Sequence, residues 1–403
     1  MTTDFDRELA ARLQALREEG LHRELREVSS ASTRLAQVAG ESLLNFSSND
    51  YLGLAAEPSL KEAAREAVAR FGAGSTASRL ICGSLSPHHE LEQLLASFKG
   101  TPAALTFSSG YTAALGAICA LAGKEDILIL DKLVHASIVD AARLSGAKLR
   151  VFAHNDLADL EDKLDWARRA RTVRPAKVLV LTESVFSMDG DQAPLREIID
   201  LKEKYGAWLM LDEAHATGLL GPHRLGLADE LGVGDRIEIQ MGTLGKALGA
   251  AGGYICGSRH LVDYLVNRAR SFIFSTAPVP AAAAAAAAGV RVVQSAEGAH
   301  RRNLLWQRVT ELLQALGRNS TPASAILPVP IGAEVEAVDT AAKLRERGVL
   351  VAAVRFPSVP RGRARLRLTL SASHTAQDVR CLADKLREVC PGILAPAHAQ
   401  PAG

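Results

Sequence analysis

The sequence of 403 residues is poor in aromatic side chains and in net charge, and these shortages exclude one class of protein. Phe, Trp and Tyr make up only 4% of the chain, and 47 Lys and Arg residues nearly balance 45 Asp and Glu residues. Surfaces that bind nucleic acid usually combine a strong positive charge with aromatic rings that stack on bases. We therefore expect no nucleic-acid partner.

Cysteine and long apolar runs are also scarce. The five cysteines are scattered and odd in number, with no C-x-x-C pair. This pattern argues against a disulfide framework and is typical of a cytosolic protein with reduced thiols. The eight alanines at 281–288 are too few and too weakly apolar for a membrane span. The charged N-terminal segment does not resemble a signal peptide. We expect a cytoplasmic protein without a membrane segment.

Apolar runs alternate with helical segments up to about residue 275, after a first helix at 4–27 and a second at 59–71. The runs read as buried strands, and the alternation indicates α/β architecture, with a largely parallel sheet covered by helices on both faces. The expected strands are AALTF, DILIL, KLRVF, KVLVLTE, AWLMLDE, IEIQMGT and GGYICG.

The pattern of predicted helices and strands changes after Pro280. A long helix at 281–315 leads to a smaller α+β domain with strands ILPVPIG, VLVAAVRF and ARLRLTL and helices at 338–347 and 376–389. The end, PGILAPAHAQPAG, is expected to be a frayed tail. The predicted division is an N-terminal helix and arm at 1–50, a large domain at 51–290 and a small domain at 291–403.

Three short motifs lack the context that their chemistry requires. Gly72-Ala73-Gly74 begins a dinucleotide fingerprint but follows a helix, not a strand. The sequence Asp212–His215 spells DEAH, but no P-loop accompanies it. His88-His89-Glu90 lacks the second histidine that a zinc-binding helix needs. We therefore expect no metal site.

The strongest chemical motif is GTLGKALG, which follows an apolar strand and contains Lys246. Burial at a strand end lowers the pKa of an amine and suits Schiff-base chemistry with a carbonyl compound. A simple loop lysine is an equal alternative on this motif alone. Asp212 ends another apolar strand, where it is suited either to a protonated pyridine nitrogen or to a core ion pair. His215 follows three residues later.

Two further motifs fit an aromatic phosphate compound. Ser108-Ser109-Gly110-Tyr111 joins a strand to an apolar helix, and backbone N–H groups at a helix start bind phosphate, although they also cap ordinary helices. His135 follows a strand, where it is suited to stacking on a ring or to a loop contact. Phosphate cradle, histidine, aspartate and lysine, in this chain order, are typical of fold type I pyridoxal phosphate (PLP) enzymes.

Eight segments together resemble the α-oxoamine synthases, which use PLP to condense an amino acid with an acyl thioester and release CO2. The resemblance runs from about residue 20 to 390 and rests on NFSSNDYLGL, HASI, FAHND, TESVFSMDGDQAPL, LDEAHATGLLG, GTLGKALG, RSFIFSTA and VPRGRARLRLTL. FAHND and SFIFSTA favour the branch that condenses L-alanine with a pimeloyl thioester in biotin biosynthesis. The 2-amino-3-ketobutyrate CoA ligases, which use glycine and acetyl-CoA, are the alternative; aminotransferases lack the FSMDGD and ARLRLTL context.

The resemblance implies roles for individual residues. Lys246, His135, Asp212 and His215 are the expected catalytic residues, and Lys246 is the Schiff-base lysine. The expected cofactor-binding residues are Ser109, Gly110, Tyr111, His135, Ser187, Asp212, His215, Thr243, Lys246, Ser275 and Thr276. The expected substrate-binding residues are Arg26, Asn49, Ser78, His135, Arg355, Ser358 and Arg367.

Some of these roles are more specific. Arg367 is expected to bind the carboxylate of the amino acid, Arg355 to assist decarboxylation, and Arg26 to bind the distal carboxylate of the pimeloyl group. Ser358 replaces the Thr that is usual in the family, and it keeps the hydroxyl. The Ser275-Thr276 segment is expected to reach the phosphate of a neighbouring subunit, which implies a homodimer with shared sites. Coenzyme A and an acyl carrier protein remain alternatives as the thiol carrier.

Overall fold

The structure is a computed structural model that describes residues 3–31, 33–171, 176–318 and 320–391. Its contacts divide the chain into two compact units. The larger comprises residues 52–187 and 191–302, and the smaller comprises residues 1–51, 188–190 and 303–403. Nearly all of the tail predicted at 391–403 lies outside the described residues.

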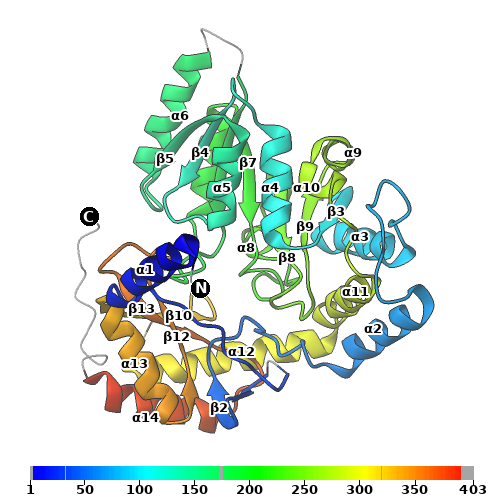
Figure 1. The fold of residues 1–403 in the computed structure, drawn as a ribbon. Helices are drawn as coiled ribbons and strands as arrows, with labels where there is room; N and C mark the ends of the chain where they lie inside the picture. The colour runs from blue at the N-terminus through cyan, green and yellow to red at the C-terminus, as the bar shows by residue number, and fades with distance from the viewer. Residues whose placement is uncertain (1–2, 32, 172–175, 319, 392–403) are drawn as a thin grey trace. The chain divides into compact units, whose positions relative to one another are not determined.

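The larger unit is built on a seven-stranded sheet in the order β3-β9-β8-β7-β6-β4-β5 (Figure 1). Strands β5, β4, β6, β7 and β8 pair in parallel, and β9 pairs antiparallel to both β8 and β3. The strands are β3 (Ala103–Phe107), β4 (Ile127–Asp131), β5 (Lys148–Phe152), β6 (Val178–Glu183), β7 (Trp208–Asp212), β8 (Ile239–Thr243) and β9 (Gly253–Gly257). The predicted largely parallel sheet is confirmed.

Burial on both faces explains why these strands were visible in the sequence. Every residue of β3, β4, β6 and β9 is buried, so each strand is a nearly continuous apolar run. Helices α4 and α5 pack against each other, and α6 packs on β5 (Figure 1). The helices of this unit are α2 (Pro58–Phe71), α3 (Ser86–Lys99), α4 (Gly110–Leu121), α5 (Ala136–Ser145), α6 (Leu157–Arg171), α7 (Leu195–Lys204), α8 (Leu227–Leu231), α9 (Arg259–Arg268), α10 (Arg270–Ile273) and α11 (Pro280–Gln294).

Helix α11 packs against α2 and α3 through its small residues. Gly289 faces the loop that follows Lys246, and a Cβ added at this position would lie only 2.2 Å from the carbonyl oxygen of Leu248. Glycine is therefore required there by the close approach of two backbone segments.

The smaller unit contains two three-stranded sheets, in the orders β1-β2-β11 and β10-β13-β12. Helix α13 packs on β10, β11, β12, β13 and α14. The strands are β1 (Leu35–Val38), β2 (Glu41–Asn45), β10 (Ile326–Gly332), β11 (Val349–Leu350), β12 (Ala352–Val354) and β13 (Ala364–Thr369), and the helices are α1 (Asp4–Glu18), α13 (Glu334–Glu346) and α14 (Ala376–Val389). Helix α12 (Ala296–Ala315) crosses the division between the units.

Several predicted boundaries are wrong. Helix α1 ends at Glu18 instead of continuing to residue 27, because Gly20 adopts a φ of +67°. The helix predicted at 281–315 is two helices, separated by the extended backbone of Ser295. The segment VLVAAVRF forms two short strands, and α13 begins four residues before the predicted start at 338. The hairpin of β1 and β2 was not predicted. No helix among the described residues has the length and apolar character needed to cross a bilayer.

Candidate functional site

Lys246 and His215 form the centre of the candidate site in the larger unit. Lys246 lies in the turn between β8 and β9, and His215 lies in the turn after β7. The Nζ atom of Lys246 is 2.8 Å from Nε2 of His215. Lys246 is half-buried and His215 is only 5% exposed. The amine therefore lies in a partly desolvated position, as Schiff-base chemistry requires.

Asp212 is a buried carboxyl at the end of β7, beside this amine. Its Oδ1 accepts a hydrogen bond of 2.8 Å from the backbone N–H of Ala214. Burial raises the pKa of Asp212, and the neighbouring charge of Lys246 opposes that shift. A buried carboxylate requires a cation nearby, and a protonated ring nitrogen meets this requirement.

Glu183 ends β6 and is a second buried carboxyl that the sequence analysis missed. It is the register partner of Asp212 in the parallel pair of β6 and β7, and it is only 2% exposed. Burial and the charge of Asp212 raise the pKa of Glu183 well above its ordinary value. The signal that identified Asp212, an acidic residue at the end of an apolar strand, was also present in KVLVLTE.

His135 is the N-cap of α5 and belongs to the same cluster. Its Nδ1 accepts a hydrogen bond of 3.2 Å from the backbone N–H of Ser137 and lies 2.8 Å from the Ser137 hydroxyl. Burial lowers the pKa of His135, and the charges of Asp212 and Lys246 act on it in opposite directions. A neutral imidazole is therefore favoured at this position.

The start of α4 supplies the expected phosphate cradle. Ser109 is the N-cap, and its hydroxyl accepts a hydrogen bond of 3.1 Å from the backbone N–H of Thr112. A Cβ placed on Gly110 would lie 3.8 Å from Cβ of Thr243, so the helix start adjoins the strand that leads to Lys246. Tyr111 is partly exposed and donates a hydrogen bond of 2.7 Å to Asp140.

A charged histidine connects two loops of this site. His154, in the FAHND motif, lies between Asp131, which ends β4, and Asp191, four residues after the buried Ser187. Its ring nitrogens lie 2.9 Å from Oδ1 of Asp131 and 2.8 Å from Oδ2 of Asp191. Hydrogen bonds to these two carboxylates raise the pKa of His154 to about 10, against the effect of burial.

Most of the expected substrate-binding residues lie in the smaller unit. Arg367 on β13 is only 7% exposed, and it donates hydrogen bonds of 3.0 Å to Oδ1 of Asn49 and to the hydroxyl of Thr369. The structure thus brings together two of the predicted residues, Arg367 and Asn49. Asn49 also accepts a hydrogen bond of 3.3 Å from the Tyr51 hydroxyl.

Three guanidinium groups gather near the end of β12. Arg355 donates to the carbonyl oxygen of His22, while its Nε is buried without a hydrogen-bond partner among the described residues. Burial lowers the pKa of Arg355, and the positive charges of Arg23 and Arg26 lower it further. Arg26 and Ser358 are exposed. Such a cluster of like charges favours an anionic ligand.

Ser78 and Thr276 form a separate contact in the larger unit. They pair in an isolated antiparallel bridge, and the N–H of Ala277 donates a hydrogen bond of 2.9 Å to the carbonyl oxygen of Ala77. Ser275 is half-buried beside them. The bridge fixes the loop that contains Arg79 against the FSTA segment.

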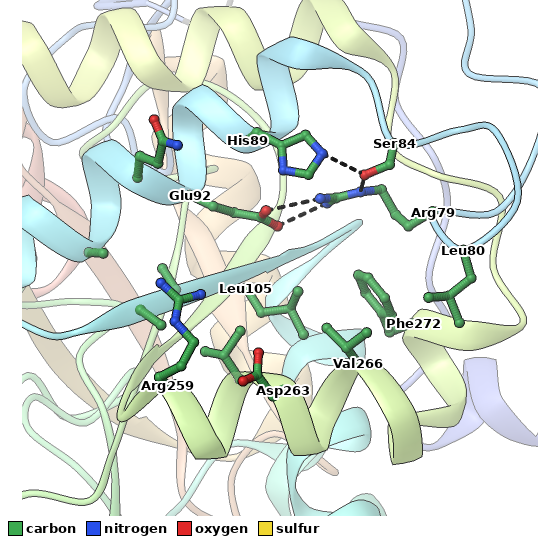
Figure 2. Close-up of a pocket in the computed structure, with 15 residues that line it drawn as sticks. Arg79, Leu80, Ser84, His89, Glu92, Leu105, Arg259, Asp263, Val266 and Phe272 are labelled. Carbon is green, nitrogen blue, oxygen red and sulfur yellow. Dashed lines mark hydrogen bonds and ion pairs between the residues drawn. The ribbon is translucent and has the colours of Figure 1, made fainter.

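A cavity of about 310 Å³ lies between α3, β3 and α9 and contains none of the Lys246 cluster (Figure 2). Its central cation, Arg79, is already paired, because its two terminal nitrogens each lie 2.9 Å from a different oxygen of Glu92. The Ser84 hydroxyl accepts a hydrogen bond of 2.9 Å from Nε of Arg79. These contacts pair Arg79 with Glu92 and Ser84 and indicate a structural role for Arg79.

Comparison with known proteins identifies the family. The sequence profile of the family "Aminotransferase class I and II" matches residues 41–386. An 8-amino-7-oxononanoate synthase of Anaeromyxobacter sp. (strain K) is 49% identical over 398 residues, which is 98% of each chain. The chain belongs to the α-oxoamine synthases of this family. One from Geobacter sulfurreducens, with the same name, is 46% identical and covers 93% of this chain and 95% of its own.

Solved structures show the same fold. A lysine-to-alanine variant of serine palmitoyltransferase from S. paucimobilis with a bound PLP-myriocin aldimine is 30% identical, with a TM-score of 0.88 over 96% of this chain and 97% of its own. An 8-amino-7-oxononanoate synthase from Francisella tularensis is 28% identical, with a TM-score of 0.71 over 86% of this chain and 98% of its own. The predicted fold type I architecture and family membership are confirmed.

The residues present fit PLP, the cofactor of this family. Two buried carboxyls, Asp212 and Glu183, face one amine, Lys246, and Oε1 of Glu183 has no hydrogen-bond partner among the described residues. The protonated ring nitrogen of PLP would bring a cation to these acidic groups, which fits the buried carboxyl of Asp212. The predicted cofactor is therefore confirmed, and the chain is a PLP-dependent transferase.

Proposed function

We propose that this protein condenses L-alanine with a pimeloyl thioester to give 8-amino-7-oxononanoate, CO2 and a free thiol, a step of biotin biosynthesis. The observation that carries the proposal is the cluster of Lys246, His215, Asp212 and His135 in a chain that matches synthases of that name over 98% of its length. The same fold also supports other amino acids and acyl groups, so the substrates require their own test.

Bound PLP supplies an electron sink for the electron pair that remains on the substrate when a bond to its α-carbon breaks. Lys246 holds the cofactor through Nζ, and the same atom removes and returns the α-proton. Asp212 would keep the ring nitrogen protonated, and His135 would stack on the ring. Backbone N–H groups of Gly110 and Tyr111 at the start of α4 hold the phosphate.

Further side chains of the larger unit complete the cofactor site in this proposal. The hydroxyls of Ser187 and Thr243 would hydrogen-bond the cofactor, and His215 would pair with its phenolic oxygen. His215 is well placed for this role because its Nε2 is already 2.8 Å from the lysine that holds the cofactor. Ser109 fixes the helix start by capping it.

The arginines supply the substrate contacts. Arg367, buried and held by Asn49, binds the α-carboxylate of L-alanine through its planar fork of donors. Arg355 assists the loss of CO2, and Arg26 binds the distal carboxylate of the pimeloyl group. Ser78 and Ser358 contribute hydroxyl contacts. The mutual proximity of Arg355 and Arg26, together with the exposed position of Arg26, supports binding of a dicarboxylic acyl group.

We also propose a homodimer with shared active sites, working in the cytoplasm with either coenzyme A or an acyl carrier protein as the thiol carrier. Three large apolar side chains near Ser275-Thr276 support the dimer: Ile81 is 80% exposed, Phe274 70% and Leu80 49%. Apolar side chains of this size are usually covered in an assembly.

The decisive experiment measures thiol release by the purified holoenzyme with L-alanine, glycine or serine and a panel of acyl thioesters. L-alanine with pimeloyl thioester should be the best pair; preference for glycine with acetyl-CoA would instead establish the ligase alternative. Arg26→Ala should lower kcat/KM for the pimeloyl donor about 10- to 100-fold while sparing an uncharged donor of similar length. Arg12→Ala, an exposed arginine on α1, is the matched control.

A further inference from the structure

Glu183 is a buried carboxyl to which the roles described above assign nothing. It ends β6 directly beside Asp212, which ends β7, because the two residues are register partners in the parallel sheet. Neither carboxyl is more than 5% exposed. Any charge on Glu183 therefore acts on the cofactor site with little screening by solvent.

The backbone contacts of Glu183 connect two loops that hold the cofactor. The backbone N–H groups of His135 and Ser187 both donate hydrogen bonds to its carboxyl group. His135 begins α5 after strand β4, and Ser187 follows strand β6. The side chain of Glu183 thus connects the backbone of His135, the proposed ring-stacking residue, to the backbone of Ser187.

Burial and the charge of Asp212 favour the neutral form of Glu183 and outweigh Lys246 and the two backbone donors, which favour the ionised form. The titratable groups whose charge acts on it are Asp212 on the adjacent strand and Lys246 from the turn after β8, whereas His135 acts through its backbone N–H. A single amine, that of Lys246, therefore acts on two buried carboxyls. Two carboxyls in one buried site do not both ionise readily, and one of them retains a proton.

We propose that Glu183 is a positioning residue that works as a neutral carboxylic acid: it fixes the loops of His135 and Ser187 and leaves the buried negative charge to Asp212. The proposal rests on the PLP site of the proposed function but not on the substrates. A protonated Glu183 prevents a second negative charge from competing with Asp212 for the cation of the ring. The ring nitrogen then pairs with one carboxylate only.

The charge is tested by Glu183→Gln, which preserves shape, an acceptor oxygen and neutrality. The measurement is the pH titration of the visible absorbance band of bound PLP in holoenzyme without substrate. The apparent pKa of that band should stay within about 0.3 unit of wild type. A decrease of about one unit or more would show that Glu183 carries a negative charge and would overturn the proposal, because loss of a nearby anion disfavours the protonated chromophore.

Glu238→Gln is the matched control for this titration. Glu238 is also a carboxylate that accepts a backbone N–H, from Leu209 at 2.8 Å, but it lies just before β8, at the opposite end of the strand from Thr243. Its loss should leave the absorbance titration unchanged. If Glu238→Gln shifted the apparent pKa of the band as much as Glu183→Gln does, the titration would not respond to local charge. The assignment of a neutral Glu183 would then fail.

The positioning role is tested by the affinity of the apoprotein for PLP, measured by fluorescence quenching. Glu183→Ala removes the acceptor of two backbone N–H groups and should raise the Kd about tenfold, whereas Glu183→Gln should stay within about twofold of wild type. An alanine variant that binds PLP like wild type would refute the role. If the alanine variant does not fold, as judged by circular dichroism, the glutamine comparison still decides the proposal. Wild type that binds PLP but makes no product from alanine and pimeloyl thioester would refute only the proposed function.

Discussion

The charged His154 should contribute stability with a distinctive dependence on pH. Its imidazolium donates to Asp131 at 2.9 Å and to Asp191 at 2.8 Å, and only 23% of its side chain is exposed. The pKa is raised to about 10 from 6.5. That difference corresponds to about 5 kcal/mol, which solvent screening reduces to roughly 2–3 kcal/mol.

The sign follows from which state binds the proton more tightly. Because the folded state has the higher pKa, the full contribution of His154 is present below pH 6.5 and is lost as the pH rises through about 10. His154→Gln should therefore lower the melting temperature of the apoprotein most near pH 6 and least near pH 10. The measurement is thermal unfolding from pH 6 to pH 10 at fixed protein concentration and ionic strength.

The outcome is judged from the difference in melting temperature between wild type and variant at each pH. Taking this difference removes the contributions of other titrating groups. His260→Gln, which changes an exposed histidine on α9, is the control, and its difference from wild type should not vary over the range. A deficit of His154→Gln that is constant with pH, or that grows toward pH 10, would refute the ion-pair argument and reduce the role of His154 to packing.

Three further predictions concern the larger and smaller units. Lys99→Met leaves Glu213, its buried partner at 2.5 Å, uncompensated, so thermal unfolding should show a loss of about 3–5 kcal/mol; full stability would contradict the ion pair. Burial lowers the pKa of His374 to about 4, so wild type should lose stability between pH 6.5 and 4, and His374→Gln should remove up to about 3 kcal/mol of that dependence. Gly289→Ala should destabilise by more than about 1 kcal/mol, because the added Cβ meets the carbonyl of Leu248 at 2.2 Å; unchanged stability would place the contact in doubt.

The parallel sheet was predictable because strands buried on both faces are continuous apolar runs. The same argument located Asp212 and Lys246, since polar residues that follow such runs stand out. Helix ends were less predictable. The helical pattern continues past Gly20, but the backbone turns there because of a positive φ and because Val335 lies close: a Cβ added to Gly20 would come within 2.8 Å of its side chain. That contact joins segments more than 300 residues apart, and no local pattern reports it.

Glu183 shows a different limit of sequence analysis. Its position at the end of an apolar run was visible, but its meaning depends on Asp212 being its direct neighbour across the sheet. Strand order decides that neighbourhood: β6 lies between β4 and β7, although β5 separates β4 from β6 along the chain. No local sequence pattern indicates that strand order, so the pairing of the two carboxyls could not be predicted.

Four carboxyls lie at or just beyond the ends of three neighbouring strands, and their partners distinguish the one beside which the cofactor is proposed to bind. Asp131, which ends β4, is balanced by an imidazolium, and Glu213, which follows β7, by a buried lysine. Glu183, which ends β6, is neutral in the proposal above. Among the charges that act on Asp212, the amine of Lys246 is the largest and His135 adds a smaller contribution; in the proposed function that amine is the group that reacts with the cofactor. Asp212 is therefore the carboxyl of the four that would gain most from a cation supplied by a ligand, and in the proposed function a protonated pyridine ring would supply it.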